Sequence, residues 1–145
     1  MKQPDVESAA VALRDLTVRL VRVGPRAGLS RTAAGTLGRL ADHGPSRITD
    51  LAVQESASQP AMTGLVQRLE QADLVVREPD PEDGRASRIA LTEAGRTALA
   101  ERRAAIDTSL VALLQQLPPE QLSTLLDALP AIESLSRISE DHALA

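Results

Sequence analysis

The chain has 145 residues, enough for one domain or for one domain with a helical extension. It contains no cysteine and no aromatic residue, which excludes disulfides and thiolate chemistry and leaves a core of Leu, Val, Ile and Ala. The net charge is −4 and no segment is a polybasic arm, so any contact with nucleic acid depends on individually placed arginines.

The N-terminal half predicts three helices in succession. Apolar residues recur at helical spacing from Val6 to Val23, which predicts a first helix that ends near Gly24. Ser30 can cap a second helix that stops at Gly44. Thr49 can cap a short third helix.

A fourth helix follows, with Ser58 at its N-cap and Pro60 in its first turn, where a missing N–H costs nothing. One face of this helix is apolar and is predicted to be buried: Met62, Leu65, Val66 and Leu69. Two helices joined by a short turn, the second of them amphipathic, predict a helix-turn-helix.

A β-hairpin is predicted next. Leu74–Glu78 favours a strand, the letters DPEDG that follow favour a turn, and Ser87–Leu91 favours a returning strand. A hairpin directly after a helix-turn-helix is a wing. Thr92 can then cap a long fifth helix.

The C-terminal part predicts two further helical segments. The fifth helix runs through Leu114, and Pro118-Pro119 ends it and starts a sixth helix, with a kink expected at Pro130. The predicted fold is therefore mainly α with a small β-hairpin wing. Its expected domains are an N-terminal dimerisation helix (1–29), a winged helix-turn-helix (30–96) and C-terminal dimerisation helices (97–145).

Several spaced motifs between Ile48 and Arg96 resemble the MarR family of bacterial winged-helix regulators. They are LA in the third helix, S-x-P-x-x-T at the start of the fourth, LE and LV-x-R after it, and DP-x-D-x-R…LT-x-x-G through the wing. The resemblance implies a homodimer that places two recognition helices in adjacent major grooves of double-stranded DNA and wing arginines in minor grooves. Three positions depart from the family pattern: Gly64 and Gly84 stand where arginines are usual, and Asp73 replaces a usual glycine.

The fourth helix is expected to be the recognition helix. Gln59, Thr63 and Gln67 share the face opposite the apolar residues, where short polar groups can reach base edges, although an ordinary solvated face has the same composition. The residues predicted to contact DNA from this helix are Ser58, Gln59, Pro60, Thr63, Gly64, Gln67 and Arg68.

The wing is predicted to contact DNA through Asp83, Arg85 and Arg88. Arg85 stands just past the turn, where its guanidinium could enter a narrow minor groove. Asp83 is expected to organise arginines by bracing Arg85 or by pairing with Arg77 or Arg88. The alternative is an ordinary surface salt bridge.

The terminal helices carry more apolar positions than two short helices can bury, which indicates either an intramolecular core or a dimer interface. The residues predicted to form a dimer interface are Leu13, Leu110, Leu113, Leu114, Leu117, Leu122, Leu125, Leu126 and Leu129.

Catalysis, metals and cofactors are not expected. His43 lies beside a helix-ending glycine and His142 near the C-terminus, and Asp80, Glu82 and Asp83 are expected on an exposed turn rather than in a cleft. No Gly-rich phosphate loop follows a strand. No apolar run approaches the roughly 18 residues of a membrane span and no leader pattern opens the chain, so a cytoplasmic protein is expected.

Two function classes remain. The first is a sequence-specific regulator, for which the resemblance implies a repressor released by a small lipophilic or aromatic acid. Arg14, Arg19 and Arg22 could then bind a carboxylate, or simply form a solvated face. The second is a winged-helix module that binds protein after losing DNA affinity. Residues 46–96 carry six basic and nine acidic side chains, a net −3, which favours the second class. The motif residues Thr63, Asp83 and Arg85 favour the first class, and a DNA-binding regulator is the function that we expect.

Overall fold

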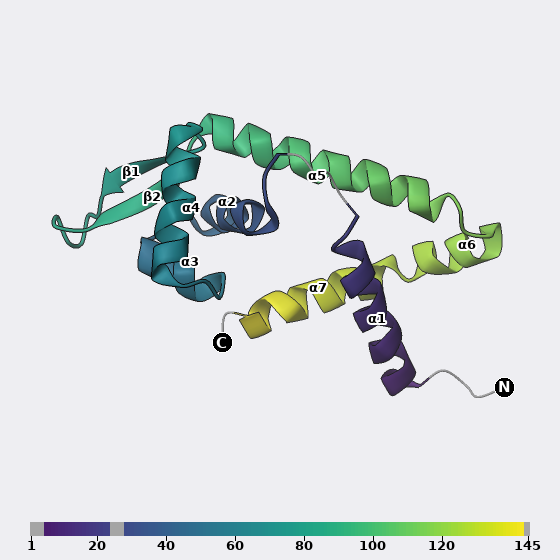
Figure 1. Ribbon diagram of the computed structural model, residues 1–145. Helices are drawn as coiled ribbons and strands as arrows, with labels where there is room; N and C mark the ends of the chain where they lie inside the picture. Colours follow the sequence, from purple (N-terminus) through teal and green to yellow (C-terminus); the bar gives the residue numbers. More distant parts are fainter. Residues whose placement is uncertain (1–4, 24–27, 144–145) are drawn as a thin grey trace. The chain divides into compact units, whose positions relative to one another are not determined.

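The computed structural model describes residues 5–23 and 28–143, with side chains described through residue 139. It confirms the predicted fold class, because the elements are helical except for one antiparallel hairpin (Figure 1). The chain divides into two compact units whose boundary falls between Ile106 and Asp107, and each unit is described by itself. The elements are α1 (Val6–Leu20), α2 (Arg31–His43), α3 (Ile48–Gln54), α4 (Gln59–Gln71), β1 (Val75–Pro79), β2 (Ser87–Leu91), α5 (Glu93–Leu114), α6 (Pro119–Asp127) and α7 (Leu129–Ala143).

Side-chain caps start three of the helices where the sequence predicts them. The Ser30 hydroxyl accepts a hydrogen bond from the backbone N–H of Ala33, at 3.1 Å, at the start of α2. Ser58 at α4 and Thr92 at α5 are bonded in the same way. The prediction for Thr49 is wrong, because α3 begins at Ile48 and no side chain caps it.

The core of the first unit lies where α2, α3 and α4 meet the hairpin and the first turns of α5. Its side chains come from every one of these elements. Close packing of many aliphatic side chains therefore forms the core, since the chain has no aromatic residue. The buried cluster consists of Ala33, Leu37, Leu40, Leu51, Ala52, Met62, Leu65, Val66, Leu69, Val75, Ile89 and Leu99.

The hairpin pairs Val75 with Leu91 and Pro79 with Ser87 at its two ends, so the first strand starts one residue later than predicted. It projects beyond the helices in Figure 1. Ser46, in the connection between α2 and α3, exchanges two backbone hydrogen bonds with Ile89, at 3.0 and 2.8 Å. The entry to the helix-turn-helix is therefore attached to the second strand of the wing.

The second unit differs from the prediction at one point. We expected a single sixth helix kinked at Pro130, but the chain breaks at Ala128 and forms two helices, α6 and α7. Pro130 is the second residue of α7, a position whose N–H has no partner within a helix, so proline costs little there. The proline thus lies in the first turn of a new helix instead of bending an old one.

Candidate nucleic-acid interface

Helix α4 has two chemically different faces. Met62, Leu65, Val66 and Leu69 are buried against the core, as the periodicity predicts. The other face carries Gln59 and Gln67, which are exposed, and Thr63, which is half-buried. The helix is therefore held by its apolar face and presents amide and hydroxyl groups on the other, where these groups can bond to base edges.

The first turn of α4 is fixed by Ser58 and Pro60. Ser58 accepts a hydrogen bond from the backbone N–H of Ala61, at 3.3 Å, and Pro60 occupies a position that needs no N–H. Both side chains are exposed. This end of the helix also carries the positive end of the helix dipole, which favours a nearby phosphate.

Gly64 and Arg68 lie one helical turn apart on α4. A Cβ built on Gly64 would lie 3.6 Å from Nη1 of Arg68, an ordinary van der Waals contact. The guanidinium of Arg68 therefore extends back towards the glycine, and α4 has room for a side chain at position 64. Arg68 makes no hydrogen bond or ion pair through its side chain with any residue that the structure describes.

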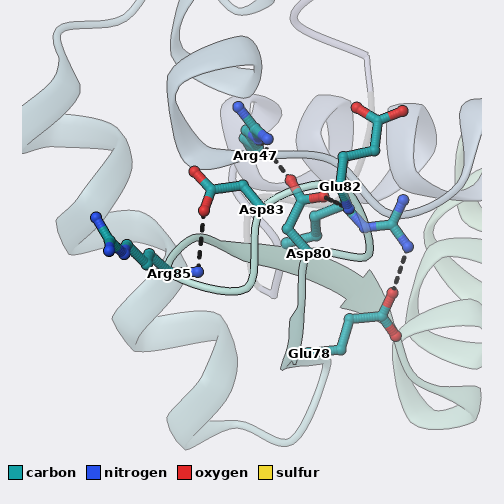
Figure 2. Close-up of polar contacts among 7 residues, drawn as sticks. Arg47, Glu78, Asp80, Glu82, Asp83 and Arg85 are labelled. Atoms are coloured by element: carbon teal, nitrogen blue, oxygen red, sulfur yellow. Dashed lines mark hydrogen bonds and ion pairs between the residues drawn. The ribbon is translucent and has the colours of Figure 1, made fainter.

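The tip of the wing is held by backbone hydrogen bonds. Asp83 Oδ1 accepts from the backbone N–H of Arg85, at 3.0 Å, and the Asp83 carbonyl accepts from the N–H of Ala86, at 2.9 Å (Figure 2). The side chain of Arg85 points away from this turn in Figure 2. Its guanidinium has no hydrogen bond or ion pair among the described residues, so it is available to a ligand.

Of the partners that we expected for Asp83, Arg77 and Arg88 are wrong, whereas the contact with Arg85 is present through the Arg85 backbone. Arg77 pairs with Glu70, at 3.0 Å, and Arg88 pairs with Glu78, also at 3.0 Å. Asp83 therefore organises Arg85 through the backbone of the turn and not through a guanidinium. Arg88 lies along the second strand with its Nε buried and without a hydrogen-bond partner in the described part of the chain.

Asp80 differs from the expectation of an exposed turn acid, because only 4% of its side chain is accessible. Oδ2 of Asp80 accepts from Nε of Arg47, at 2.6 Å, and Oδ1 accepts from the backbone N–H of Glu82, at 2.9 Å (Figure 2). The Arg47 bond is the largest of the effects that hold the pKa of Asp80 below its ordinary value, and the Glu82 bond acts in the same direction. The same bond raises the pKa of Arg47.

The sequence analysis assigned no role to Arg47 and did not predict that Asp80 is buried and bonded to it. The two residues are 33 positions apart, so no local pattern joins them. An Asp before a Pro at the start of a turn was the one available signal, since such residues often accept backbone N–H bonds two positions on. Arg47 immediately precedes α3 and gives no signal of its own.

Ion pairs neutralise much of the acidic charge near these residues. Within residues 46–96, all of which the structure describes, the pairs engage five of the nine acidic side chains and leave Arg68 and Arg85 unpaired. The net charge of the segment therefore understates the positive charge available at α4 and the wing. The paired acids are Glu55, Glu70, Glu78, Asp80 and Glu93.

None of the nine leucines predicted to form a dimer interface is buried within the chain. Leu13 in α1 is 44% exposed and Leu126 in α6 is 52% exposed. Helices α1 and α6 bury no residue at all. The apolar residues of these helices therefore remain accessible within the chain.

The described residues provide neither a cluster of metal ligands nor a membrane-spanning helix. No three His, Cys, Asp or Glu side chains among them lie close enough together to hold a metal ion. No helix in the described part of the chain is long and apolar enough to span a membrane.

Comparisons with known proteins agree with this geometry. Residues 29–87 match the model of the MarR family. A stretch of 60 residues is 42% identical to the HTH-type transcriptional repressor NicR of Pseudomonas putida, covering 41% of this chain and 38% of the length of that protein.

Solved structures match over much more of the chain. A transcriptional regulator from Thermotoga maritima has a TM-score of 0.77 at 23% identity, with 93% of this chain and 98% of that chain covered. MepR, a transcription regulator of the Staphylococcus aureus multidrug efflux pump MepA, has a TM-score of 0.69 at 21% identity, with 86% and 96% covered. At these identities the two structures show the fold. Residues 29–87 are therefore similar in sequence to the MarR family, and the chain shares the fold of solved winged-helix transcriptional regulators.

Proposed function

We propose that the chain is a homodimeric repressor that binds a pseudo-palindromic DNA site through α4 and the wing. The observation that carries this proposal is the division of α4 into a buried apolar face and a polar face with Gln59, Thr63 and Gln67. A helix held in this way can lie in a major groove, where a Gln amide can bond to adenine through both of its polar atoms.

The wing supports the same proposal. Arg85 is exposed at its tip and unpaired among the described residues, while Asp83 holds the backbone beneath it. A guanidinium presented in this way fits a narrow and strongly negative minor groove. Contacts from α4 specify bases, whereas contacts to phosphates and to the minor groove position the protein.

A homodimer is supported by the exposed leucines of the terminal helices. A second copy would cover these side chains, and its α4 would bind a second half-site about one helical turn away. Sedimentation at micromolar concentration should give the mass of a dimer. A monomer at that concentration would contradict the proposal.

Repression is supported by the name of one relative, and release by a small molecule is what the resemblance to the family implies. NicR is named a transcriptional repressor, and MepR a regulator of a multidrug efflux pump. We expect the effector to be a lipophilic or aromatic organic acid. Arg14 and Arg19 on α1 and Arg22 just after it are candidates for its carboxylate, although Arg14 already pairs with Asp15, at 2.9 Å.

The test is binding to the DNA upstream of the protein's own gene, measured by fluorescence anisotropy at two salt concentrations with a random duplex as control. We expect tighter binding to the upstream DNA at both salt concentrations and weaker binding to both duplexes at the higher one, because phosphate contacts release counterions. Equal affinity for the two duplexes would contradict a sequence-specific regulator of this gene.

A winged-helix module that binds protein is the second candidate. It is favoured by Glu82 and Asp83, which are exposed next to the wing tip and would approach DNA phosphates. Under this candidate neither duplex binds at either salt concentration, although the chain is folded and dimeric.

A further inference from the structure

Arg47 is well placed to orient the wing even though it is not part of the wing. It lies immediately before α3, and its Nε donates to Asp80, the residue that follows β1. We propose that Arg47 is a positioning residue for DNA binding, which fixes the direction of Arg85 through Asp80 without contacting base or phosphate itself. The part of the proposal that concerns DNA rests on the function proposed above.

The connection runs through three consecutive contacts, two of which Figure 2 shows. Arg47 bonds to one oxygen of the Asp80 carboxylate at 2.6 Å, and the N–H of Glu82 bonds to the other at 2.9 Å. The backbone N–H of Asp80 also donates to the carbonyl of Ala86, at 3.1 Å, across the base of the turn. Asp80 therefore joins the residue before α3 to both sides of the loop that carries Arg85, through its carboxylate on one side and its backbone N–H on the other.

Burial makes this contact more restrictive than a surface ion pair. The Asp80 side chain is 4% accessible, so its charge has little water to replace a lost partner. Arg47 itself is 41% accessible, so the difference lies in the carboxylate: the acids of the other ion pairs are more open, including Glu70, the partner of Arg77, at 27%. Without Arg47, Asp80 would gain water most readily by turning outwards, and the loop would move with it.

A second attachment limits which movement is possible. The backbone of Ser46, the neighbour of Arg47, is bonded to Ile89 in β2. The base of the hairpin stays attached when Arg47 is changed, whereas the turn from Asp80 to Ala86 depends on the Asp80 carboxylate. The predicted effect of the change is therefore local to the wing tip, with the core unaffected.

The first experiment measures the wing tip without DNA. Trypsin cleaves after exposed arginines, and cleavage after Arg85 can be followed by mass spectrometry in the full-length protein. We expect cleavage at that bond to be roughly tenfold faster in Arg47→Gln than in wild type, because local opening controls the rate. The matched control is Arg77→Gln, which removes the same charge from a more open pair and should leave the rate unchanged.

The second experiment measures coupling in DNA binding. Distant independent changes add to within about twofold in affinity, whereas coupled ones do not. If Arg47 acts through Arg85, the Arg47→Gln/Arg85→Ala double variant should bind the upstream duplex as Arg85→Ala alone does. If Arg47 contacts DNA itself, the fold-loss of affinity in the double variant should equal the product of the fold-losses in the two single variants. That result would overturn the proposal.

Two further variants separate positioning from general destabilisation. Arg47→Lys keeps the charge and should restore most of the wild-type protection from trypsin. Asp80→Asn removes the same bond from the other side and should also speed cleavage after Arg85, so the test remains available if Arg47→Gln fails to fold. Unchanged trypsin cleavage after Arg85 in both Arg47→Gln and Asp80→Asn would overturn the proposal. A chain that binds no DNA contradicts the proposed function, but the proteolysis still decides whether Arg47 positions the wing.

Discussion

Gly95 lies so close to the backbone of Leu74 that a methyl group on its α-carbon would overlap the Leu74 carbonyl oxygen. The contact packs the first turn of α5 against the connection between α4 and β1. Thr92 donates its hydroxyl hydrogen to the carbonyl of Asp73, at 2.6 Å, and accepts from the N–H of Gly95, at 3.0 Å. Asp73 has φ 58°, so the aspartate adopts the left-handed conformation for which the family usually has glycine.

Gly95→Ala should therefore destabilise the protein. Alanine favours a helix over glycine by about 1 kcal/mol, but overpacking against a fixed backbone costs roughly 1–3 kcal/mol or more. The matched control is Gly38→Ala, also at a buried helical glycine, where the nearest atom to a new Cβ is the flexible Nη2 of Arg103, at 3.5 Å. Urea unfolding should show a loss for Gly95→Ala and none for Gly38→Ala, and equal stability of the two variants would contradict this packing argument.

The ion pair of Asp80 should appear in the pH dependence of stability. The pKa of Asp80 is lowered in the folded chain, chiefly by the hydrogen bond from Arg47. A carboxyl group whose pKa is lower in the folded state than in the unfolded state stabilises the fold. The stabilisation is complete above the unfolded-state pKa of about 4, and it is lost as the pH falls through the folded-state pKa. Asp80→Asn should thus be less stable than wild type at neutral pH, with a difference that shrinks in acid.

Urea unfolding from pH 7 down into the acid range measures this difference. Asp5 also has a lowered pKa, through its bonds to Ser8, but it is present in both proteins and cancels in the comparison. A stability difference that stays constant down to the lowest pH would mean that Asp80 contributes through shape and not through charge.

Local patterns in the sequence account for most of the fold. The caps of Ser30 and Ser58, the buried face of α4 and the second strand depend on neighbours within a few residues, so spacing alone reveals them. Thr49 failed as a cap because the chain before α3 is fixed by tertiary contacts: Ser46 is bonded to β2 and Arg47 to Asp80.

The candidate site was less predictable for the same reason. The exposed polar residues of α4 follow from helical periodicity, but ion-pair partners depend on which elements meet in space. Arg88 could have paired with several nearby acids, and Glu78 binds it because the strand register places the two residues opposite each other. The burial of Asp80 depends on how Ser46 and Arg47, which precede α3, meet the wing, and no local pattern encodes that contact.

Arg85→Ala should weaken DNA binding without lowering stability. The side chain is exposed and unpaired among the described residues, so its removal costs the free protein little. Anisotropy titrations with the upstream duplex and a thermal melt measure the two quantities. A lower melting temperature with unchanged DNA affinity would show that Arg85 has a structural role.

The release of DNA should respond to small organic acids and not to oxidants or metals. The chain has no cysteine to oxidise, and His43 and His142 are its only histidines. Peroxide, zinc and nickel should leave the anisotropy of the DNA complex unchanged, while a panel of lipophilic and aromatic acids should include compounds that lower it. Release by micromolar zinc would contradict this prediction.

Gly64→Arg should tighten binding to the upstream and the random duplex alike. The structure has room for a side chain at this position, since the nearest atom to a new Cβ is the movable Nη1 of Arg68, at 3.6 Å. Replacing a glycine within a helix also favours the helix, by roughly 1 kcal/mol for alanine. We expect an arginine here to add one phosphate contact per subunit, as the resemblance to the MarR family implies.

Salt dependence distinguishes such a contact from a base contact. Each phosphate contact contributes about 0.9 to the slope of log affinity against log salt, so a dimer of Gly64→Arg should have a slope steeper by roughly 2. Gly64→Ala is the matched control, because it favours the helix equally but adds no charge and should leave the slope unchanged. The competing explanation is that Gly64 allows the helix backbone to approach the groove closely. In that case both variants would lose affinity for the upstream duplex while random DNA bound as well as before, and that pattern would overturn our interpretation of this glycine.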